Sequence, residues 1–318
     1  MRRAATIVAL AGLVAAGLAG CSSTASAANC GSAAAPGAAS DTIHVAGPFG
    51  TSSPEVSFPT PLKTTTTQRT ILTPGSGPLL QDGQTVVGEI SIYNGATGQL
   101  MPPASYGAAP GPITFNIGGT LPGISNGLLC ARDHSRVAIA VSPNDGTKDG
   151  ATSLVVVVDV KKAYLPRANG TPDVHVPNTP RVFLAPNGAP GIVVPNVAPP
   201  KKLTVIPTKT GHGESVKKGD AVIVQFTGVV WNDDKNVFTS TWNGSGATAI
   251  VADSSSSGPL ADGVTRGLAQ ALIGAKVGSQ LQVTVPPRLG YGASGSAEAP
   301  KNATLVYVVD VLGIHHSS

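Results

Sequence analysis

Residues 306–311 read Val-Tyr-Val-Val-Asp-Val and residues 155–160 read Val-Val-Val-Val-Asp-Val, so two largely apolar hexapeptides that differ at one position occur in the chain. Working outward from this pair, further blocks recur in the same order. They are Gly75, Gly77 and Gly83 with Gly211, Gly213 and Gly219; Val86 with Val222; residues 123–128 with 263–268; and residues 137–143 with 281–287. Blocks repeated in one order indicate an internal duplication.

The second copy has the pattern of strands around one short helix. Residues 222–228 and 281–285 alternate apolar and polar side chains, which predicts strands with one buried face. Between them Val264, Leu268 and Leu272 recur at helical spacing, and Gly274 suits the end of a helix. We therefore expect an α+β fold, with each copy an antiparallel β-sheet wrapped on one short helix and its other face in water.

Two biased segments divide the chain. Residues 166–200 contain nine prolines and predict an extended linker with turns at Asn169-Gly170 and Asn187-Gly188. Residues 21–65 are rich in Ala, Ser, Thr, Gly and Pro and predict a flexible tether. The expected domains are then residues 66–165 and 201–318.

The first residues have the pattern of an export signal. Arg2 and Arg3 precede an apolar run that ends in Leu-Ala-Gly-Cys at residues 18–21. This ending resembles the lipobox of bacterial lipoproteins, which implies removal of residues 1–20 and a lipid on Cys21. The small residues 25–27 offer an ordinary cleavage site as the alternative. We expect an extracytoplasmic protein, lipid-anchored to the cell membrane in the first case and secreted in the second.

With Cys21 lipidated, Cys30 and Cys130 remain as an even pair in an oxidising compartment. One interpretation is a disulfide that fastens the N-terminal segment to the first domain. The alternative is two unrelated thiols, with Cys130 a small buried apolar residue. The sequence has no CxxC, which disfavours thiol redox chemistry.

The composition excludes several classes of protein. Charged residues make up 12% of the chain, against about 25% in an average protein, which disfavours a salt-bridged helical bundle. The 39 glycines and 27 prolines favour short strands and long loops. With a formal charge of +4 and no long basic run, we expect no nucleic-acid partner.

Residues 201–314 resemble an FK506-binding-protein-type peptidyl-prolyl cis-trans isomerase domain. The matching segments cover the whole domain in order: Gly211-His-Gly, Val216-Lys-Lys-Gly-Asp220, Val224-Gln-Phe-Thr-Gly228, Val237-Phe-Thr-Ser240, Gly274-Ala-Lys-Val-Gly278, Pro286-Pro-Arg-Leu-Gly-Tyr-Gly292 and Ala303-Thr-Leu305. The stretch around residues 191–200 is similar to the linker of tandem-domain lipoproteins of this family.

The resemblance implies a binding pocket for proline. Aromatic positions of the pocket fall on Phe226, Phe238 and Tyr307. The position that binds the substrate carbonyl falls on Val264 and the backbone N–H of Thr265, and the tyrosine whose hydroxyl binds ligand falls on Tyr291. The alternative for these aromatic residues is plain filling of a core.

The chain departs from the family pattern at three positions. Leu268 stands where the family has a tryptophan at the pocket floor, which makes the floor smaller. Thr239 replaces an aspartate and removes an ionised acceptor. Ala299 replaces an isoleucine and opens one wall.

Isomerisation requires no nucleophile and no cofactor. An X–Pro bond adopts both isomers within about 1 kcal/mol and exchanges slowly. The resemblance implies an isomerase that assists the folding of proline-containing secreted or surface polypeptides and also binds FK506-like macrolides. The alternative is a non-catalytic module that binds extended polypeptide.

The first copy lacks comparable side chains. Ile90 falls at an aromatic position and Pro102-Pro103 near the Phe238 site, so we expect the same fold without catalysis. Gly123-Ile-Ser-Asn-Gly127, near Asp133 and His134, fits a hydrolase nucleophile pattern, but that pattern needs a mostly parallel sheet. His315-His316 is a weak candidate for metal binding.

Overall fold

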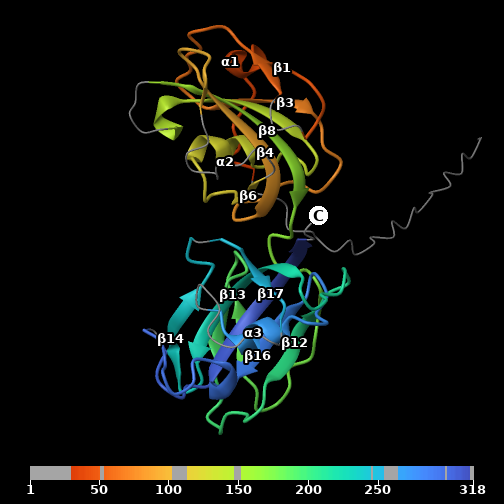
Figure 1. The fold of residues 1–318 in the computed structure, drawn as a ribbon, viewed down its shortest axis with the longest axis vertical. Helices are drawn as coiled ribbons and strands as arrows, with labels where there is room; N and C mark the ends of the chain where they lie inside the picture. The colour runs from red at the N-terminus through yellow and green to blue at the C-terminus, as the bar shows by residue number, and fades with distance from the viewer. Residues whose placement is uncertain are drawn as a thin grey trace, which may run out of the picture.

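The computed structural model describes residues 30–50, 54–101, 113–146, 152–244, 246–253, 264–297 and 299–315, whose strands form one large sheet from each copy of the repeat (Figure 1). The expected signal peptide, residues 1–20, and Cys21 lie outside the described residues. Within the described ranges, no helix has the length and hydropathy needed to cross a bilayer.

The C-terminal sheet is antiparallel and has the order β14-β13-β17-β16-β12-β9, with β15 also paired to β13. Its strands are β9 (Thr171–Pro172), β12 (Thr204–Thr210), β13 (Ala221–Val230), β14 (Asp233–Ser240), β15 (Thr248–Val251), β16 (Gln280–Val285) and β17 (Leu305–His315). Helix α3 (Arg266–Ala271) lies on one face, and the short 3₁₀ helix η3 (Pro287–Leu289) follows β16.

The N-terminal sheet has the equivalent order β3-β7-β8-β4-β5, with β6 also paired to β4. Its strands are β3 (Gln68–Thr73), β4 (Thr85–Asn94), β5 (Leu100–Met101), β6 (Ile113–Asn116), β7 (Arg136–Val141) and β8 (Leu154–Ala163). Helix α2 (Pro122–Leu128) corresponds to α3, and the 3₁₀ helix η1 (Pro143–Asp145) to η3. The expected antiparallel sheets with few helices are confirmed, and the two sheets have equivalent strand orders.

One part of the expected repeat alignment is wrong by a helical turn. A Cβ on Gly123 would strike Val141, and a Cβ on Gly267 would strike Val285, which ends the equivalent strand. Gly123 is therefore the counterpart of Gly267, whereas the alignment of residues 123–128 with 263–268 paired Gly127 with Gly267. The two glycines serve the same purpose, because each lets a helix lie close to the end of a strand.

The turns that follow the two helices confirm the shifted alignment. Gly274 has φ 83° and donates to the carbonyl of Val216 at 2.8 Å, while Cys130 has φ 59° and donates to the carbonyl of Leu80 at 2.9 Å. Glycine is the usual residue in this left-handed conformation. In the first copy this position holds a cysteine, because its sulfur forms a disulfide.

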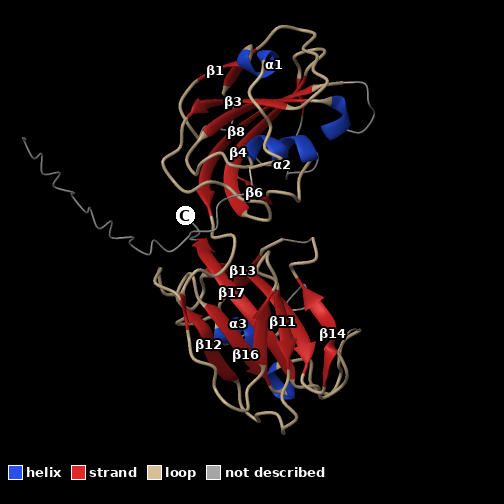
Figure 2. Cartoon of the chain, turned by 180° about the vertical axis from the view of Figure 1, so that it is seen from behind, coloured by secondary structure: helices blue, strands red, loops and turns tan. Residues whose placement is uncertain are grey.

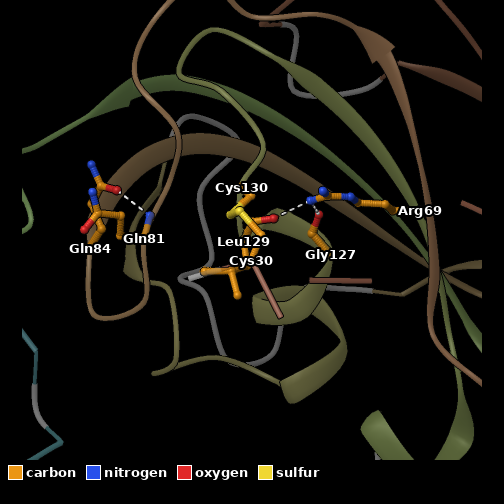
Figure 3. Close-up of a disulfide and its surroundings, with 7 residues drawn as sticks. All are labelled: Cys30, Arg69, Gln81, Gln84, Gly127, Leu129 and Cys130. Atoms are coloured by element: carbon orange, nitrogen blue, oxygen red, sulfur yellow. Dashed lines mark hydrogen bonds between the residues drawn. A yellow bond between two sulfur atoms is a disulfide. The ribbon is translucent and has the colours of Figure 1, made fainter. Parts of the chain in front are cut away.

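Cys130 forms a disulfide with Cys30, which confirms one of the two interpretations of this pair. The bond joins positions 100 residues apart and fastens the N-terminal segment beside the end of α2 (Figure 3). Arg69 donates to the carbonyls of Gly127 and Leu129 at the same helix end, where a positive charge is favourable.

The tether and the linker both differ from expectation, because each contains a hairpin that covers a sheet. Strands β1 (His44–Ala46) and β2 (Glu55–Ser57) pair in the first segment, after a single-turn helix α1 (Ala38–Asp41). Strands β10 (Arg181–Leu184) and β11 (Pro190–Val193) pair in the second, with the expected turn at Asn187-Gly188. Each hairpin precedes the first long strand of its sheet, so the repeated unit is a hairpin followed by a sheet and helix.

These hairpins explain why the hexapeptides are apolar at almost every position. On β17, Tyr307 and Val309 face the core under α3, whereas Val306 and Val308 pack with Val182 and Ile192 of the hairpin. On the N-terminal sheet, Val45 and Val56 of the β1–β2 hairpin pack with Ala138, Ala140 and Val155 in the same way. The expectation that one face of each sheet lies in water is therefore wrong, because both faces are covered (Figure 2).

The two sheets touch through the end of β8 and the end of β17. Tyr164 is buried with Val87, Ile223 and Leu312. Its hydroxyl lies 3.2 Å from Nδ1 of His315, and the adjacent Leu165 amide donates to the carbonyl of Leu312 at 3.1 Å.

Candidate functional site

The expected site residues lie together under the N-terminal end of α3. Phe226 on β13 and Tyr307 on the neighbouring strand β17 point to the helix-covered face. Val264, Leu268, Phe238 and Tyr291 belong to the same apolar cluster. Five separate segments therefore contribute to the site: β13, β17, the start of α3, β14 and the turn after η3.

The aromatic rings are in edge-to-face contact with one another. Ring centroids are 6.1 Å apart for Phe226 and Tyr307, 5.6 Å for Phe238 and Tyr307, and 6.3 Å for Phe238 and Tyr291, with interplanar angles of 72°, 74° and 81°. Aromatic pairs prefer this geometry. Phe226 and Tyr307 are buried, whereas Phe238 and Tyr291 are partly exposed and face an incoming ligand first.

Gly228 makes room for the outer ring. A Cβ at this position would lie 2.9 Å from Cζ of Phe238 and 2.8 Å from Cγ2 of Thr239. Gly228 is the strand partner of both Thr239 and Tyr307. The glycine of the Val224–Gly228 segment is thus needed for the Phe238 side chain to lie over the strand.

Thr265 begins the helix at the edge of the site. Its backbone is extended, with φ −95° and ψ 156°, and its hydroxyl accepts from the amide of Leu268 at 3.4 Å. Threonine is a favoured N-cap residue because its hydroxyl satisfies an unpaired helix amide. Thr265 and Leu268 are both 0% exposed, so the floor is fully covered.

Thr239 lies at the rim, partly exposed on the edge strand β14. Its methyl group faces Gly228, as the close approach of Cγ2 shows. Ala299, which replaces the family's isoleucine, is 2% exposed in the same apolar cluster. The wall at residue 299 is thus closed by a small residue.

Tyr307 carries the unusual polar group of the site. Its side chain is 0% exposed, and no described residue makes a hydrogen bond of normal geometry with its hydroxyl, although the side chains of Thr265 and Tyr291 interact with it. Burial raises the pKa of this hydroxyl well above its ordinary value of 10.0, and the nearby Tyr291 raises it further. The phenol therefore stays protonated at neutral pH.

Thr241 is a positioning residue that the sequence analysis did not single out. Its hydroxyl accepts from the amide of Phe226 at 3.0 Å, and its own amide donates to the carbonyl of Phe226 at 3.0 Å. These bonds fix the backbone that carries the inner ring. The only signal in the sequence was a threonine directly after the Val237–Ser240 segment.

The same positions of the N-terminal sheet hold aliphatic side chains. Ile90 occupies the place of Phe226 in the strand register, and Val156 occupies the place of Tyr307. The expected match of Pro102-Pro103 to the Phe238 site lies outside the described residues. This sheet therefore lacks the inner pair of rings.

The hydrolase pattern in α2 has no triad geometry. The Ser125 hydroxyl is 2.9 Å from both the Gly118 amide and the Thr120 hydroxyl, and the surrounding sheet is antiparallel. His134 pairs with Asp133 at 3.3 Å, on an exposed turn. In the described part of the chain, no group of three His, Cys, Asp or Glu side chains could hold a metal ion.

Comparisons with known proteins show which family the C-terminal residues resemble. The family model for FKBP-type peptidyl-prolyl cis-trans isomerases matches residues 212–312. A Probable FK506-binding protein of Corynebacterium glutamicum is 30% identical over 123 residues, which cover 39% of this chain and 96% of that protein. The FKBP-type peptidyl-prolyl cis-trans isomerase FkpA of Escherichia coli is 31% identical over 106 residues, covering 33% of this chain and 35% of FkpA.

FK506-binding protein 4 of Chaetomium thermophilum is 32% identical over 112 residues, and the chain spans only 21% of its length. Among solved structures, the N-terminal domain of FKBP42 from Arabidopsis thaliana is 26% identical and covers 39% of this chain and 98% of that domain, with a TM-score of 0.33.

Proposed function

Because the chain belongs to the FK506-binding-protein family of peptidyl-prolyl cis-trans isomerases, we propose that residues 201–318 isomerise X–Pro bonds of extracytoplasmic polypeptides and so assist their folding. The observation that supports this most directly is the convergence of Phe226, Phe238, Tyr291 and Tyr307 at the N-terminal end of α3.

The reaction needs a site that favours a twisted peptide bond. Rotation is opposed by the partial double-bond character of C–N, with a barrier of about 18–20 kcal/mol. An apolar cup disfavours the charge-separated planar form and so binds the twisted amide better. In this proposal Phe238 and Tyr291 contact the proline ring, while the Thr265 amide and the Tyr291 hydroxyl hold peptide carbonyls.

A second candidate is a non-catalytic module that binds polypeptide. It is favoured by the closed floor, since Leu268 and Tyr307 are 0% exposed. A proline could then rest on Phe238 and Tyr291 without entering the pocket. Thr239 also favours the binding module, because it cannot supply an ionised acceptor at the rim.

Relaxation of a short X–Pro peptide from cis to trans distinguishes the two. We would measure it with the full mature chain, with Phe238→Ala, and with Phe183→Ala as a matched control, since Phe183 is 59% exposed on β10. The isomerase predicts acceleration proportional to protein concentration, lost in Phe238→Ala and kept in Phe183→Ala. If the rate equals the uncatalysed rate for peptides with different residues before proline, the isomerase is excluded and the non-catalytic binding module is the remaining candidate.

We propose that the N-terminal unit, residues 66–165 with their preceding segment, has kept the fold without catalysis. The support is the aliphatic Ile90 and Val156 at positions of the inner rings. Phe226→Ile with Tyr307→Val, which copies this arrangement into the C-terminal unit, should abolish the acceleration. Normal turnover by that double variant would contradict the proposal.

We propose an extracytoplasmic site of action, with the chain held to the membrane by a lipid on Cys21. The Cys30–Cys130 disulfide supports an oxidising compartment. Metabolic labelling with a fatty acid tests the lipid: wild-type protein should be labelled and fractionate with membranes, and Cys21→Ala should do neither. We also propose binding of FK506-like macrolides at the aromatic site, which the Phe238→Ala variant should weaken in a titration.

A further inference from the structure

The hydroxyl of Tyr307 is a buried polar group that the fold does not use. No hydrogen bond of normal geometry reaches it from the described residues. By contrast, the hydroxyl of Tyr164, another buried tyrosine, lies 3.2 Å from Nδ1 of His315. Buried polar atoms are nearly always paired, and an unpaired one destabilises the folded protein, so a lasting exception indicates a use.

The position of this hydroxyl indicates what the use is. The Tyr307 ring lies between Phe226 and Phe238, in edge contact with both. The side chains of Thr265 and Tyr291 lie close enough for weak hydrogen-bond interactions to act on the hydroxyl's pKa, although neither contact has normal hydrogen-bond geometry. These are the two residues at which the proposed reaction holds peptide carbonyls.

The ring that packs on Tyr307 from the open side of the site belongs to an edge strand. Phe238, whose ring is 5.6 Å from that of Tyr307, is carried by β14 at the edge of the sheet and is partly exposed. For a peptide to reach the phenol, the Phe238 ring would have to rotate, and its partly exposed position leaves room for this. The uncovered group is a neutral donor, because burial keeps it protonated.

Resting on the proposed function, we propose that the Tyr307 hydroxyl donates a hydrogen bond to a carbonyl oxygen of the bound X–Pro peptide, and is thus a catalytic residue in addition to an aromatic wall. Binding would then satisfy a donor that is unpaired in the free protein. A bond that strengthens as the amide twists would contribute to turnover and not only to affinity.

The test compares Tyr307→Phe with Tyr164→Phe in the full chain. Each variant removes one buried hydroxyl and no ring, but only the first should touch substrate. For Tyr307→Phe we expect kcat/KM for a cis-to-trans peptide to fall about tenfold, with a urea unfolding midpoint equal to or above that of the wild type. For Tyr164→Phe we expect unchanged kcat/KM and a lower midpoint.

Two results would overturn the inference while the proposed function stands. One is wild-type kcat/KM in Tyr307→Phe. The other is a fall in both activity and unfolding midpoint in that variant, which would show that the hydroxyl is a structural partner.

Calorimetric titration with the same proline peptide distinguishes failure of this inference from failure of the proposed function. If the wild type does not catalyse but Tyr307→Phe binds the peptide about tenfold more weakly, the hydrogen bond stands and the isomerase does not. Equal affinities in that case, or no binding by the wild type, would overturn both.

Discussion

Asp159 and Asp310 occupy equivalent places on β8 and β17, and each carboxylate is held by a different kind of partner. Arg136, directly opposite Asp159, donates to it twice, at 2.6 and 2.7 Å. Gln280, opposite Asp310, donates a single bond at 2.8 Å, and the Ala168 amide donates a second at 2.8 Å. Both units thus keep a buried carboxylate at this position, and the first holds it with an arginine in direct contact, whereas the second holds it with an amide side chain and has its cations, Lys209 and Arg167, acting only through their charge.

Removing the cation in the first unit should be costly. Arg136→Met leaves Asp159 buried at 2% exposure without its charge partner, and breaking such a pair costs about 3–5 kcal/mol. The variant also loses bonds from Arg136 to the carbonyls of Gly47 and Pro48. We expect a lower free energy of unfolding in urea. Lys161→Met, which breaks an outer pair with Glu89 at 3.7 Å, should cost at most about 1 kcal/mol, and equal losses would contradict this reading.

The buried Asp310 carboxylate should make stability depend on pH. Burial raises the pKa of Asp310 above its ordinary value of 3.8 in the folded state, although bonds from Ala168 and Gln280 and the charges of Lys209 and Arg167 oppose the shift. The folded state then binds a proton more tightly than the unfolded state. Stability from this group is present below pH 3.8 and is lost as pH rises through the raised pKa.

We would measure urea midpoints of wild type and Asp310→Asn at several pH values. The wild type should lose stability relative to the variant as pH increases from about 4 towards neutrality. A constant difference across this range would show that the folded-state pKa is not raised. The variant should be less stable at low pH, because its amide nitrogen faces a donor.

Gly228→Ala should damage the site more than the fold. The new methyl group would lie 2.9 Å from Cζ of Phe238 and push this partly exposed ring aside. We expect kcat/KM to fall at least about tenfold, or about 1.4 kcal/mol of transition-state binding, with a small change in unfolding midpoint. Gly191→Ala is the control, because its methyl group would meet only the carbonyl of Phe183 at 3.6 Å.

Restoring the family's tryptophan at position 268 should overpack the core and should not improve the site. Leu268 is 0% exposed in a packed cluster, so Leu268→Trp overpacks the core at a cost of about 1–3 kcal/mol. We expect a lower unfolding midpoint and no gain in kcat/KM. Leu268→Met, which nearly conserves volume, should cost less than about 1.5 kcal/mol. A faster and equally stable tryptophan variant would show that the floor has spare room.

The disulfide should account for much of the first unit's stability. Closing a segment of 100 residues contributes about 2–5 kcal/mol. Cys30→Ala should lose this stability under oxidising conditions and match the wild type once a reductant is added. Cys130→Gly should lose less, because glycine suits the φ of 59° at this position. Equal losses in the two variants would contradict that difference.

Much of the fold was predictable from the repeated blocks and the alternation of strands 222–228 and 281–285. The helix register was not, because glycines recur every four residues in 123–127 and 263–267, and only the contact of Gly123 with Val141 distinguishes the two alignments. The hairpins were missed because Pro and Ser obscured short pairs such as Val45 and Val56.

The site was predictable as a set of residue types at family positions, and the structure brings Phe226, Phe238, Tyr291 and Tyr307 together as expected. The sequence could not show that the Tyr307 hydroxyl lacks a partner, because pairing depends on neighbours from other strands. It also could not show the role of Thr241, whose bonds to Phe226 follow from the path of the chain after β14.

In both units the innermost strand is also the last strand of the unit to be synthesised. β8 lies between β7 and β4, and β17 lies between β16 and β13, so neither sheet can close until residues 154–163 or 305–315 have emerged. Contacts between segments so far apart in the chain form slowly. While the chain is being made or exported, the N-terminal unit can therefore finish folding before the aromatic site of the same chain exists.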